Sequence, residues 1–491
     1  MMVKPCSFKG GIHIPYNKDR TTGKTAELVP TPKQVVIPIN QHLGAPNKAI
    51  VAVGDAVKRG QKIADAAAPG PMTVPVHASI AGIVKKIEAR LQSNNTEGLC
   101  VVIEADDAVS GDEFMPPLDP FACNKEEALE RIREAGVVGM GGAGFPAHVK
   151  LNPPPAKKID FIIADGAECE GYLTTDEAAI RAKTDVVVRG VAILMRITGV
   201  KNGIIGMEDN KAVITDASSG ASINLVEKLE KAVSNLKNEL KNKFPGEIEV
   251  KLCQTRYPQG GEKLLIKALT GREVPPPPAL PADAGCIVQN VASLIAISEA
   301  FNVWDIDKNE WSNHGRPLIK RGLTVSGGAC GAPRNIVAPI GTVLADLPAE
   351  YFGVDYGKLE KIVFGGPMMG VAVPHLNIPI QKNTSGVNFF TAAETYADAE
   401  GYCIRCGRCI KDCSMRLYPV LMNNALEAAD FDEAERIGLM DCIECGSCTF
   451  NCPARIRLVQ RFRVGKFKLR NYVAAKAAAA KAKEEAAKAK G

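Results

Sequence analysis

Aromatic side chains are scarce in this 491-residue sequence, since they make up 5% of it and include two Trp. This scarcity argues against a function that depends on aromatic stacking platforms. A strong charge of one sign is missing as well, because 60 Lys and Arg stand against 55 Asp and Glu, which leaves +5. The last twenty residues (472–491) hold five Lys and two Glu, so they carry +3 of that excess. The remaining chain is nearly neutral, which argues against a general nucleic-acid-binding protein.

Long apolar runs are also absent from the sequence. No uninterrupted apolar stretch reaches the length that spans a bilayer. The start of the chain, residues 1–6, lacks the apolar stretch of a secretory signal peptide. We therefore expect a protein that is soluble or peripheral to a membrane.

The sequence does have length and apolar residues. At about 150 residues per domain, its length predicts about three or four domains. Hydrophobic residues are 46% and charged residues 23%, so sizeable cores can form. Fifteen Cys are present, and eight of them fall in two tight runs near the C-terminus. That spacing is typical of metal ligands in a reducing compartment rather than of a disulfide framework.

The first segment predicts a small all-β module. Short stretches at 34–39 and 76–84 alternate between apolar and polar residues and are bounded by turn residues. Two stretches, VGDAVKRGQKIA and VHASIAGIVKKI, resemble the barrel-sandwich of lipoyl and biotin carriers. Such carriers need a Lys at the hairpin tip, and no Lys lies between Lys62 and Lys85. We therefore expect the barrel without a swinging arm.

The middle of the chain predicts an α/β domain of about 200 residues. Asn124 is expected to cap a helix that Gly136 ends. The periodicity then predicts a strand at 159–164, helices at about 176–197 and 223–243, and a strand at 247–252. A second β-rich module is expected at 323–347 and ends near 363–370. The Lys/Ala-rich tail has helix propensity but no apolar stripe.

The two cysteine runs have the same spacing, CxxCxxCxxxC. Three Cys at this spacing wrap one cubane cluster, and in two-cluster ferredoxins the fourth Cys of each run ligates the other cluster. The pattern predicts these ligands: Cys403, Cys406, Cys409 and Cys452 for the first cluster (cluster one), and Cys442, Cys445, Cys448 and Cys413 for the second (cluster two). Structural zinc is the alternative, but zinc sites usually pair two CxxC motifs across a longer loop. The doubled run is therefore far more specific for two [4Fe–4S] clusters.

The densest glycine cluster is GMGGAGFP, residues 139–146. It matches the dinucleotide fingerprint GxGxxG in form, but a helix rather than a strand precedes it and Pro146 follows closely. We interpret the match as unrelated to a Rossmann site, although Asp165 stands about 20 residues further on. A loop whose backbone amides face an anion still fits a bound phosphate or flavin. The alternative is a tight turn without a ligand.

Several motifs in one order resemble a known family. GMGGAGFPAHVKL (139–151) is similar to the flavin loop of the NADH-oxidising subunit of respiratory complex I. DGAECEGY (165–172), YPQGGEKLLI (257–266) and VQNVASLIAI (288–297) follow in the order of that subunit. FKGGIHIP at the start, a β-module near Ser326 and the doubled cysteine run complete a resemblance to the C subunit of Rnf-type ion-translocating ferredoxin:NAD oxidoreductase complexes. The resemblance covers nearly the whole chain except the tail.

The resemblance implies a multidomain α/β protein. Its parts would be an N-terminal barrel-sandwich β module (1–115), an FMN- and NADH-binding α/β domain like the flavin subunit of complex I (116–312), a β-grasp module of the soluble-ligand-binding type (313–385), a helical ferredoxin-like domain with two [4Fe–4S] clusters (386–472) and an Ala/Lys-rich tail (473–491).

The resemblance also implies site residues, carried over by position. The FMN would be lined by Gly139, Gly141, Gly142, Gly144, Phe145, Lys150, Asp165, Glu262 and Asn290. Glu168 and Glu170 match catalytic acidic residues that could orient the ribose or the nicotinamide amide, and the alternative for each is a solvated loop charge. Three positions depart from the family pattern, since Asp165 replaces Asn, Gly171 replaces Pro and Gly261 replaces Glu. A carboxylate at Asp165 would repel the FMN phosphate if it faced it.

The expected chemistry follows from electron counting. Nicotinamide transfers a hydride, which is two electrons, whereas a [4Fe–4S] cluster takes one, and a flavin converts between the two. We expect NAD(H), FMN and two [4Fe–4S] clusters as cofactors. The resemblance implies a ferredoxin:NAD+ oxidoreductase subunit coupled to ion translocation. It also implies a peripheral place on the cytoplasmic side of the inner or plasma membrane, beside a ferredoxin-like B subunit and membrane subunits, with ferredoxin reached indirectly.

Two other functions remain open at this point. A flavin-dependent cobalamin reductase has a similar architecture but generally lacks the leading GGIH segment. A flavin-free iron–sulfur scaffold has no reason to keep the glycine loop. The basic stretch at 455–470 can dock a partner or an anionic surface, or it can pack as a helix on its own domain with a solvated face.

Overall fold

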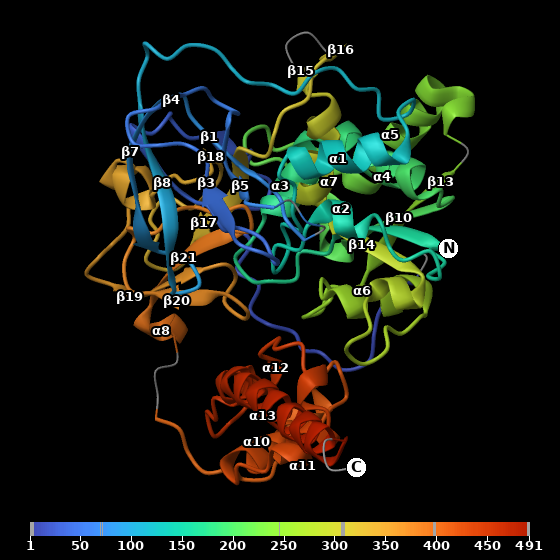
Figure 1. The fold of residues 1–491 in the computed structure, drawn as a ribbon, viewed down its shortest axis with the longest axis vertical. Helices are drawn as coiled ribbons and strands as arrows, with labels where there is room; N and C mark the ends of the chain where they lie inside the picture. Colours follow the sequence, from blue (N-terminus) through green and yellow to red (C-terminus); the bar gives the residue numbers. More distant parts are fainter. Residues whose placement is uncertain are drawn as a thin grey trace.

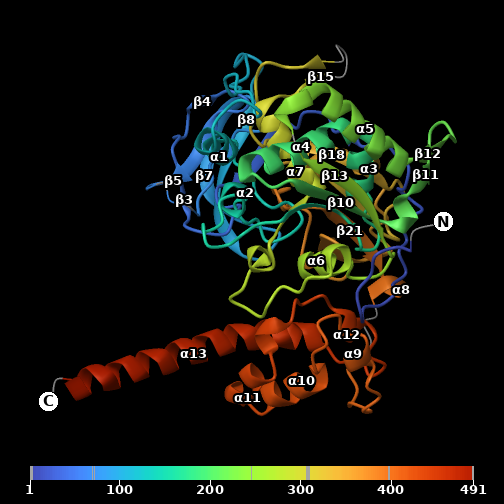
Figure 2. The ribbon, with the colours of Figure 1, turned by 90° about the vertical axis from the view of Figure 1, so that its right-hand side faces the viewer.

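The computed structural model describes residues 4–68, 70, 72–244, 246–305, 310–395 and 399–488. Figures 1 and 2 show a large body, made of two β-modules and an α/β domain, and a smaller helical part below it. The smaller part holds both cysteine runs, and we call residues 399–488 the cysteine module. Residues 1–3 at the start of the sequence and 489–491 of the predicted tail lie outside the described residues.

The N-terminal β-module has two sheets around a common core. One sheet has the order β2-β8-β7-β4, with β2 at Gln34–Pro38, β8 at Glu97–Ala105, β7 at Gly82–Leu91 and β4 at Ala56–Val57. The other has the order β3-β5-β6, with β3 at Asn47–Ala49, β5 at Lys62–Ala66 and β6 at Val76–His77. Alternate apolar residues such as Val35, Ile37 and Ile63 are buried together. The predicted all-β module is confirmed.

The α/β domain is built on a four-stranded parallel sheet. Its order is β13-β10-β9-β14, with β13 at Glu247–Cys253, β10 at Asn202–Glu208, β9 at Phe161–Gly166 and β14 at Cys286–Asn290. Both faces of the sheet are apolar, because Ile162 packs in one core and Ile163 in another. Such double burial is typical of parallel sheets covered by helices on both sides.

Helices cover both faces of this sheet. The face of Ile162 shares its core with α1 (Lys125–Glu134), α4 (Thr184–Thr198), α5 (Leu225–Leu240) and α7 (Val291–Phe301), whereas α6 (Glu262–Thr270) packs in the core of Ile163. As predicted, Asn124 caps α1, in a reciprocal pair of hydrogen bonds with Glu127. Two hairpins complete the domain, β11 (Val213–Thr215) with β12 (Ser222–Asn224) and β15 (Trp304–Asp305) with β16 (Glu310–Trp311).

The prediction of one helix at 176–197 is wrong. The structure has two helices, α3 (Thr175–Ala182) and α4, which are separated at Lys183. Lys183 leaves the helical conformation, with φ −129° and ψ 40°. Its ammonium donates a hydrogen bond of 2.6 Å to Glu299 of α7, so a tertiary contact competes with the helical periodicity at this residue.

The second β-module is a six-stranded mixed sheet. Its order is β1-β18-β17-β21-β19-β20, with β1 at Glu27–Leu28, β18 at Arg334–Pro339, β17 at Lys320–Ser326, β21 at Gly386–Thr391, β19 at Leu359–Phe364 and β20 at Val371–Val373. The sheet continues past residue 385, where the sequence predicts its end, because Val387 and Phe389 of β21 are fully buried in its core.

The described residues 4–28 do not join the N-terminal barrel, in contrast to the expectation for 1–115. The backbone of Cys6 forms a parallel β-bridge with Cys253, beside the parallel sheet of the α/β domain. Strand β1 pairs in parallel with β18 of the second β-module. Figure 2 shows this dark blue segment passing between the body and the cysteine module. The chain start therefore connects parts that are far apart in the sequence.

The cysteine module is helical, and α8 (Ala392–Thr395) precedes it. It contains α9 (Arg408–Lys411), α10 (Pro419–Glu427), α11 (Phe431–Arg436), α12 (Ser447–Phe450) and α13 (Leu458–Lys488). Helix α13 begins in the basic stretch and continues into the Lys/Ala tail, which projects from the body in Figure 2. Leu458, Phe462 and Leu469 of this helix are buried in the module core, so its apolar side packs on its own module. Within the described residues, no helix combines the length and the apolar character needed to cross a bilayer.

Glu299 connects α7 to two neighbouring segments through Lys183 and Arg316. Its carboxylate accepts hydrogen bonds of 2.6 Å from both Lys183 and Arg316. Burial alone would raise the pKa of this carboxyl, but the two cations outweigh burial and lower the pKa of Glu299 to about 2. A lowered folded pKa means that this stabilisation is present above the unfolded pKa of about 4.3 and is lost as the pH falls toward 2.

We therefore predict that Glu299→Gln lowers the free energy of unfolding by about 2–3 kcal/mol at pH 7, since one pKa unit corresponds to about 1.4 kcal/mol. The measurement is urea unfolding followed by fluorescence of Trp304 and Trp311, the two Trp of the chain. The difference from the unaltered protein should shrink as the pH is lowered from 5 to 3. A difference that stays constant over this range would contradict the assignment.

Candidate flavin and iron–sulfur sites

The predicted site residues meet at one edge of the parallel sheet. Strands β9 and β14 are neighbours, although β10 and β13 lie between them in the sequence, so the strand order reverses at this pair. Open α/β sheets bind ligands outside the carboxyl ends of the strands at such a switch point. Asp165 lies at the carboxyl end of β9 and Asn290 at that of β14, where the two residues are register partners. The sheet therefore builds a crevice where the sequence predicts a cofactor.

The glycine loop lies over this crevice. It follows α1 and precedes α2 (Ala147–Lys150), and the Gly139 amide donates to the Phe145 carbonyl at 2.8 Å. The Met140 amide donates to the Ser293 hydroxyl at 2.8 Å, at the start of α7. A Cβ placed on Gly141 would lie 3.0 Å from the Asn290 Cβ, so the loop backbone is in close contact with the end of β14.

The same loop leaves room for an anionic group. Gly141 and Gly142 are exposed, and a Cβ placed on Gly142 would meet no atom within 4 Å. Gly144 turns the chain back into the protein, where it is buried against Gln41. An open glycine backbone above the switch point of a parallel sheet fits the phosphate of a flavin nucleotide.

Asp165 is half-buried at the centre of the crevice. Its carboxylate accepts from the Ala167 amide at 3.1 Å. Burial, and next the neighbouring carboxyl of Asp176, raise the pKa of Asp165 well above its ordinary value. Asn290 donates to Asp176 at 2.8 Å and so fixes the second carboxyl. The raised pKa favours the neutral form of Asp165, which weakens the repulsion that its replacement of Asn suggests.

Lys150 and Glu262, both predicted to line the flavin, form an ion pair. The Lys150 ammonium lies 2.6 Å from the Glu262 carboxylate and also donates to the Val288 carbonyl at 3.2 Å. Lys150 thereby ties α2 to α6 and to β14. The Glu262 carboxylate therefore partly neutralises the positive charge that Lys150 brings to the crevice.

The two predicted catalytic acids differ in their surroundings. One Glu168 oxygen accepts from the Asp176 amide at 3.0 Å, and the other is buried without a hydrogen-bond partner. Both Glu170 oxygens are occupied, because they accept from the amides of Met368 and Met369 at 3.0 and 2.8 Å. Burial raises the pKa of Glu170 to about 7. Glu168 therefore retains an oxygen for a ligand, whereas Glu170 holds a turn of the second β-module.

Three charged residues beside this site are missed by sequence reasoning. Lys18 donates to the Leu173 carbonyl at 2.7 Å and lies 3.9 Å from the Glu168 carboxylate. Glu208, at the end of β10, has two buried oxygens without a partner, and burial raises its pKa to about 7. Lys211 is buried next to these acids, and burial lowers its pKa. No motif marks them, although Glu208 ends a predictable strand at the ligand edge of the sheet.

The two cysteine runs fold as a structural repeat. Gly407 and Gly446 have φ of 73° and 80°, and Arg405 and Glu444 have φ of 54° and 57°. Each pair occupies equivalent positions in the two runs. Amides also point at sulfur, since Glu444 donates to Cys442 Sγ at 3.4 Å. Hydrogen bonds to ligand sulfurs tune the potential of iron–sulfur clusters.

The structure brings the four predicted ligands of cluster two together. Cys413, Cys442, Cys445 and Cys448 line one cavity, although Cys413 comes from the first run. Burial raises the pKa of Cys442 to about 11 and is only partly offset by the hydrogen bond from the Glu444 amide and by the Lys466 charge. In the first run, Cys403 and Cys406 are exposed and lie near Cys409, and Cys452 is half-buried against the same module core as Cys409.

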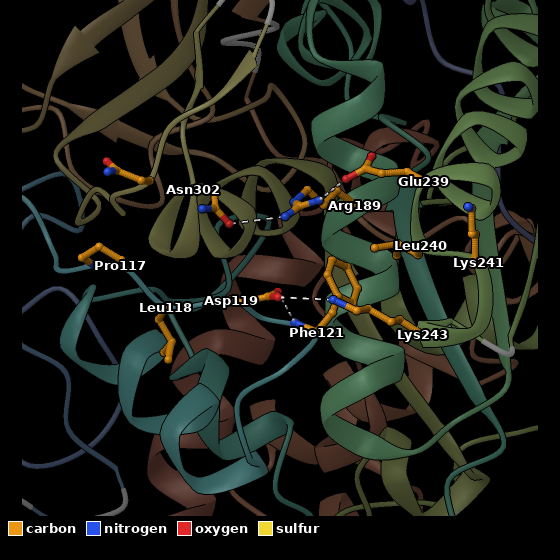
Figure 3. Close-up of a pocket in the computed structure, with 11 residues that line it drawn as sticks. Pro117, Leu118, Asp119, Phe121, Arg189, Glu239, Leu240, Lys241, Lys243 and Asn302 are labelled. Atoms are coloured by element: carbon orange, nitrogen blue, oxygen red, sulfur yellow. Dashed lines mark hydrogen bonds and ion pairs between the residues drawn. The ribbon is translucent and has the colours of Figure 1, made fainter.

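A separate cavity of about 630 Å³ lies away from the crevice. Figure 3 shows it between the loop before α1, helix α4 and the end of α5. Its buried cation, Arg189, donates to Glu239 and Asn302, both at 3.3 Å. The same guanidinium lies over the rings of Phe121 and Trp311. This cation is already paired and stacked, so we place the cofactor site at the sheet edge.

Comparison with known families divides the chain in the same way. Residues 6–108 match the RnfC barrel sandwich hybrid domain, and residues 132–299 match the Nuo51 FMN-binding domain. Residues 396–453 match a 4Fe-4S dicluster domain. The FMN-binding match contains the glycine loop and both strands of the switch point, and the dicluster match contains both cysteine runs.

Curated relatives cover almost the full length. The C subunit of a proton-translocating ferredoxin:NAD(+) oxidoreductase complex from Clostridium ljungdahlii is 41% identical over 93% of this chain and 93% of its own length. The chain belongs to the family of C subunits of ion-translocating ferredoxin:NAD(+) oxidoreductase complexes. Further family members are the C subunit of a Na(+)-translocating complex from Acetobacterium woodii (39% identical over 95% of this chain and 98% of its own length) and that of an ion-translocating oxidoreductase complex from Rhodobacter capsulatus (35% identical over 94% of this chain and 83% of its own length).

Membership of this C-subunit family confirms several predictions. The predicted barrel-sandwich, the flavin-subunit-like α/β domain and the two-cluster iron–sulfur module are confirmed. FMN and two [4Fe–4S] clusters are the cofactors that these domains bind, and an oxidoreductase subunit is the class of protein. The cobalamin reductase, the zinc site and the flavin-free scaffold are not supported. The names of the relatives differ in the ion, which is a proton in one and Na(+) in another.

Proposed function

We propose that this chain is the NAD(H)-oxidoreducing subunit of a membrane-associated complex that couples ferredoxin:NAD+ electron transfer to ion translocation. One observation carries the proposal: an open glycine loop lies over the switch point of a parallel sheet, in the same chain as a doubled cluster-binding module. A hydride carrier and two one-electron clusters then belong to one polypeptide.

The chain's residues would divide the binding of the flavin between them. FMN, when bound, supplies the conversion between hydride and single-electron transfer. The amides of Gly141, Gly142 and Gly144 would face the phosphate. Gly139, whose amide donates to the Phe145 carbonyl, would shape the loop, and Phe145, Lys150, Asp165, Glu262 and Asn290 would form the walls of the crevice. Glu168, one oxygen of which is buried without a hydrogen-bond partner and lies 3.9 Å from the Lys18 ammonium, would orient the ribose or the amide of the nicotinamide. The crevice needs no acid or base, because hydride transfer depends on position.

Glu170 has an indirect role in this proposal. Its carboxylate binds the turn at Met368 and Met369, so it would shape the nicotinamide side of the crevice without contacting the substrate. The domain division at 115, 312, 385 and 472 is also part of the proposal. Residues 4–28 and β21 are exceptions, because they pack outside the parts in which these boundaries place them.

The surface around cluster one would meet the other subunits. Cys403 and Cys406 are exposed, and the side chains of Arg405 and Arg408 beside them are exposed as well. A basic face around an accessible cluster suits an acidic one-electron carrier, because opposite charges steer association. We propose the ferredoxin-like B subunit as that carrier, with ferredoxin reached through it, and the membrane subunits as the anchor of a peripheral chain on the cytoplasmic side.

Anaerobic reduction of the purified holoprotein tests the proposed function. NADH should bleach the flavin absorbance and reduce both clusters, and extraction should yield one FMN per chain and four irons and four sulfides per cluster. Dithionite provides the control, because it reduces the clusters without any flavin. A holoprotein whose clusters respond to dithionite while NADH changes neither chromophore would refute the proposal.

A further inference from the structure

The N-terminal segment at 6–15, which we call the strap, binds the α/β domain on one side. The Cys6 amide donates to the Leu252 carbonyl and the Cys6 carbonyl accepts from the Gln254 amide, both at 2.8 Å. Further on, Ile12 and Tyr257 exchange two backbone hydrogen bonds of 2.8 and 2.9 Å. The strap therefore follows β13 and the loop after it, next to the ligand edge of the sheet.

On its other side, the same strap touches Cys413, a predicted ligand of cluster two. The Gly11 amide donates to the Asp412 carbonyl at 3.0 Å. Gly10 has φ +84°, and a Cβ there would lie 2.6 Å from the carbonyl oxygen of Cys413. Gly11 has φ +75°, and its Cβ would lie 2.5 Å from the Tyr257 carbonyl oxygen. Only glycine fits both positions, because the backbone is left-handed and the strap is enclosed between a cluster ligand and the α/β domain.

Tyr257 makes a second connection to the same cluster. Its side chain is fully buried, and its hydroxyl donates to the Cys445 carbonyl at 2.6 Å. Its ring packs in a small apolar cluster with Ile12 and Cys169, and Cys445 lies against that cluster. Cys169 belongs to the loop that follows β9 at the switch point. One side chain thus connects the predicted flavin crevice to a ligand of cluster two.

A third connection comes from the second β-module. Glu170 accepts from the amides of Met368 and Met369. The Met368 carbonyl oxygen lies 3.1 Å from the position of a Cβ on Gly446, which follows Cys445. Glu170 therefore positions a turn that touches the loop around cluster two.

Cluster one has the opposite surroundings. In the described part of the chain, no hydrogen bond joins residues 399–411 to the body. Tyr402 and Ile404, which flank Cys403, are 96% and 67% exposed. The cysteine module therefore presents cluster two to the body and cluster one to the outside.

We propose that cluster two is the flavin-side cluster, that the strap and Tyr257 are the positioning residues that hold it there, and that cluster one is the outward cluster. The inference rests on the proposed function, because it orders the two clusters within it. The electrons balance: oxidation of one NADH to NAD+ and a proton releases two electrons, and the two clusters take up one each. Hydrogen bonds and burial near the ligands are known means of setting cluster potentials.

Equivalent ligand variants test the order. Cys406→Ala and Cys445→Ala remove the same position from the two runs, so each should leave one cluster, which iron counting and EPR after dithionite reduction verify. In Cys406→Ala, NADH should reduce the remaining cluster about as fast as in the unaltered protein. In Cys445→Ala, NADH should reduce the remaining cluster at least 100-fold more slowly, although dithionite still reduces it. Equal rates, or the reverse order, would overturn the inference.

Two milder variants keep the test valid if Cys445→Ala loses both clusters. Tyr257→Phe and Gly10→Ala leave every ligand in place. Both should slow the NADH-driven reduction of the clusters at least tenfold and shift the EPR signal or midpoint potential of cluster two alone. Gly54→Ala is the matched control, because Gly54 also has a left-handed φ of +98°, but a Cβ placed there would meet no atom within 4 Å.

The outcomes also separate this inference from the proposed function. An unaltered protein whose flavin does not respond to NADH would refute the proposed function itself. A flavin that NADH bleaches, combined with a shift confined to cluster one in Tyr257→Phe, would refute only the order of the clusters. An unchanged EPR signal and rate in both Tyr257→Phe and Gly10→Ala would remove the positioning role.

Discussion

Replacing Gly142 by Glu is expected to weaken FMN binding by about 100-fold or more. The Gly142 position is open, because a Cβ there has no neighbour within 4 Å. A carboxylate at this point would face the flavin phosphate above the switch point, and juxtaposed like charges cost several kcal/mol. A loss of about 3 kcal/mol corresponds to roughly two orders of magnitude in Kd. Titration of the flavin-depleted protein with FMN, followed by flavin fluorescence, measures the effect.

The matched control for this variant is Gly142→Gln, which has the same size without the charge. We expect it to weaken FMN binding by about tenfold or less, because only crowding and not repulsion acts. Neither variant should change the unfolding temperature of the flavin-depleted protein, since the site has room for a side chain. Equal affinities of the Glu variant and the unaltered protein would place the phosphate elsewhere.

Much of this architecture follows from local patterns. The alternation of apolar residues predicts the barrel, the Asn124 cap predicts the start of α1, and the doubled CxxCxxCxxxC run predicts the cluster ligands. These signals are readable because short-range periodicity, capping and ligand spacing each act over about a dozen residues or fewer. The structure brings Cys413 to Cys442, Cys445 and Cys448 in the way that the crossed pattern predicts.

Other features cannot be read from local patterns. Lys183 breaks a helical period because Glu299 lies near it in space, more than a hundred residues away in sequence. The strap reaches Cys413 only in the folded chain, and β21 joins a sheet whose other strands come earlier. The occupied carboxylate of Glu170 is a similar case, because its partners belong to another module. Long-range contacts of this kind decide which predicted residues remain available to a ligand.

The apparent conflict at Asp165 shows how burial changes the meaning of a residue. In sequence, an acid replaces the usual Asn beside a phosphate site. In the structure, burial and then the Asp176 carboxyl raise the pKa of Asp165, which favours the protonated form of its carboxyl. A protonated carboxyl has one donor and one acceptor and so resembles the side-chain amide of Asn.

We therefore predict that FMN affinity falls as the pH rises, and that Asp165→Asn removes most of this dependence. Ionisation of Asp165 at higher pH would place a negative charge beside the flavin and weaken binding by about tenfold, or about 1.4 kcal/mol. Titrations with FMN between pH 6 and 9 measure the effect. Asp176, Glu262 and Lys150 face the Asp165 carboxyl, and the pKa of Asp176 is itself raised to about 7. The variant Asp176→Asn therefore separates the titration of Asp165 from that of Asp176.

The same substitution has a consequence for stability that does not depend on FMN. An acid with a raised folded pKa binds more protons in the folded state, so its contribution to stability declines as the pH rises from about 3.9 to the folded pKa. Asn cannot ionise, and Asp165→Asn should therefore stabilise the flavin-depleted protein at pH 8 by about 1 kcal/mol or more, which thermal unfolding would detect. A variant that binds FMN with unchanged pH dependence and unfolds at the same temperature would show that Asp165 is already ionised, and that the buried carboxyl pair shares its proton in another way.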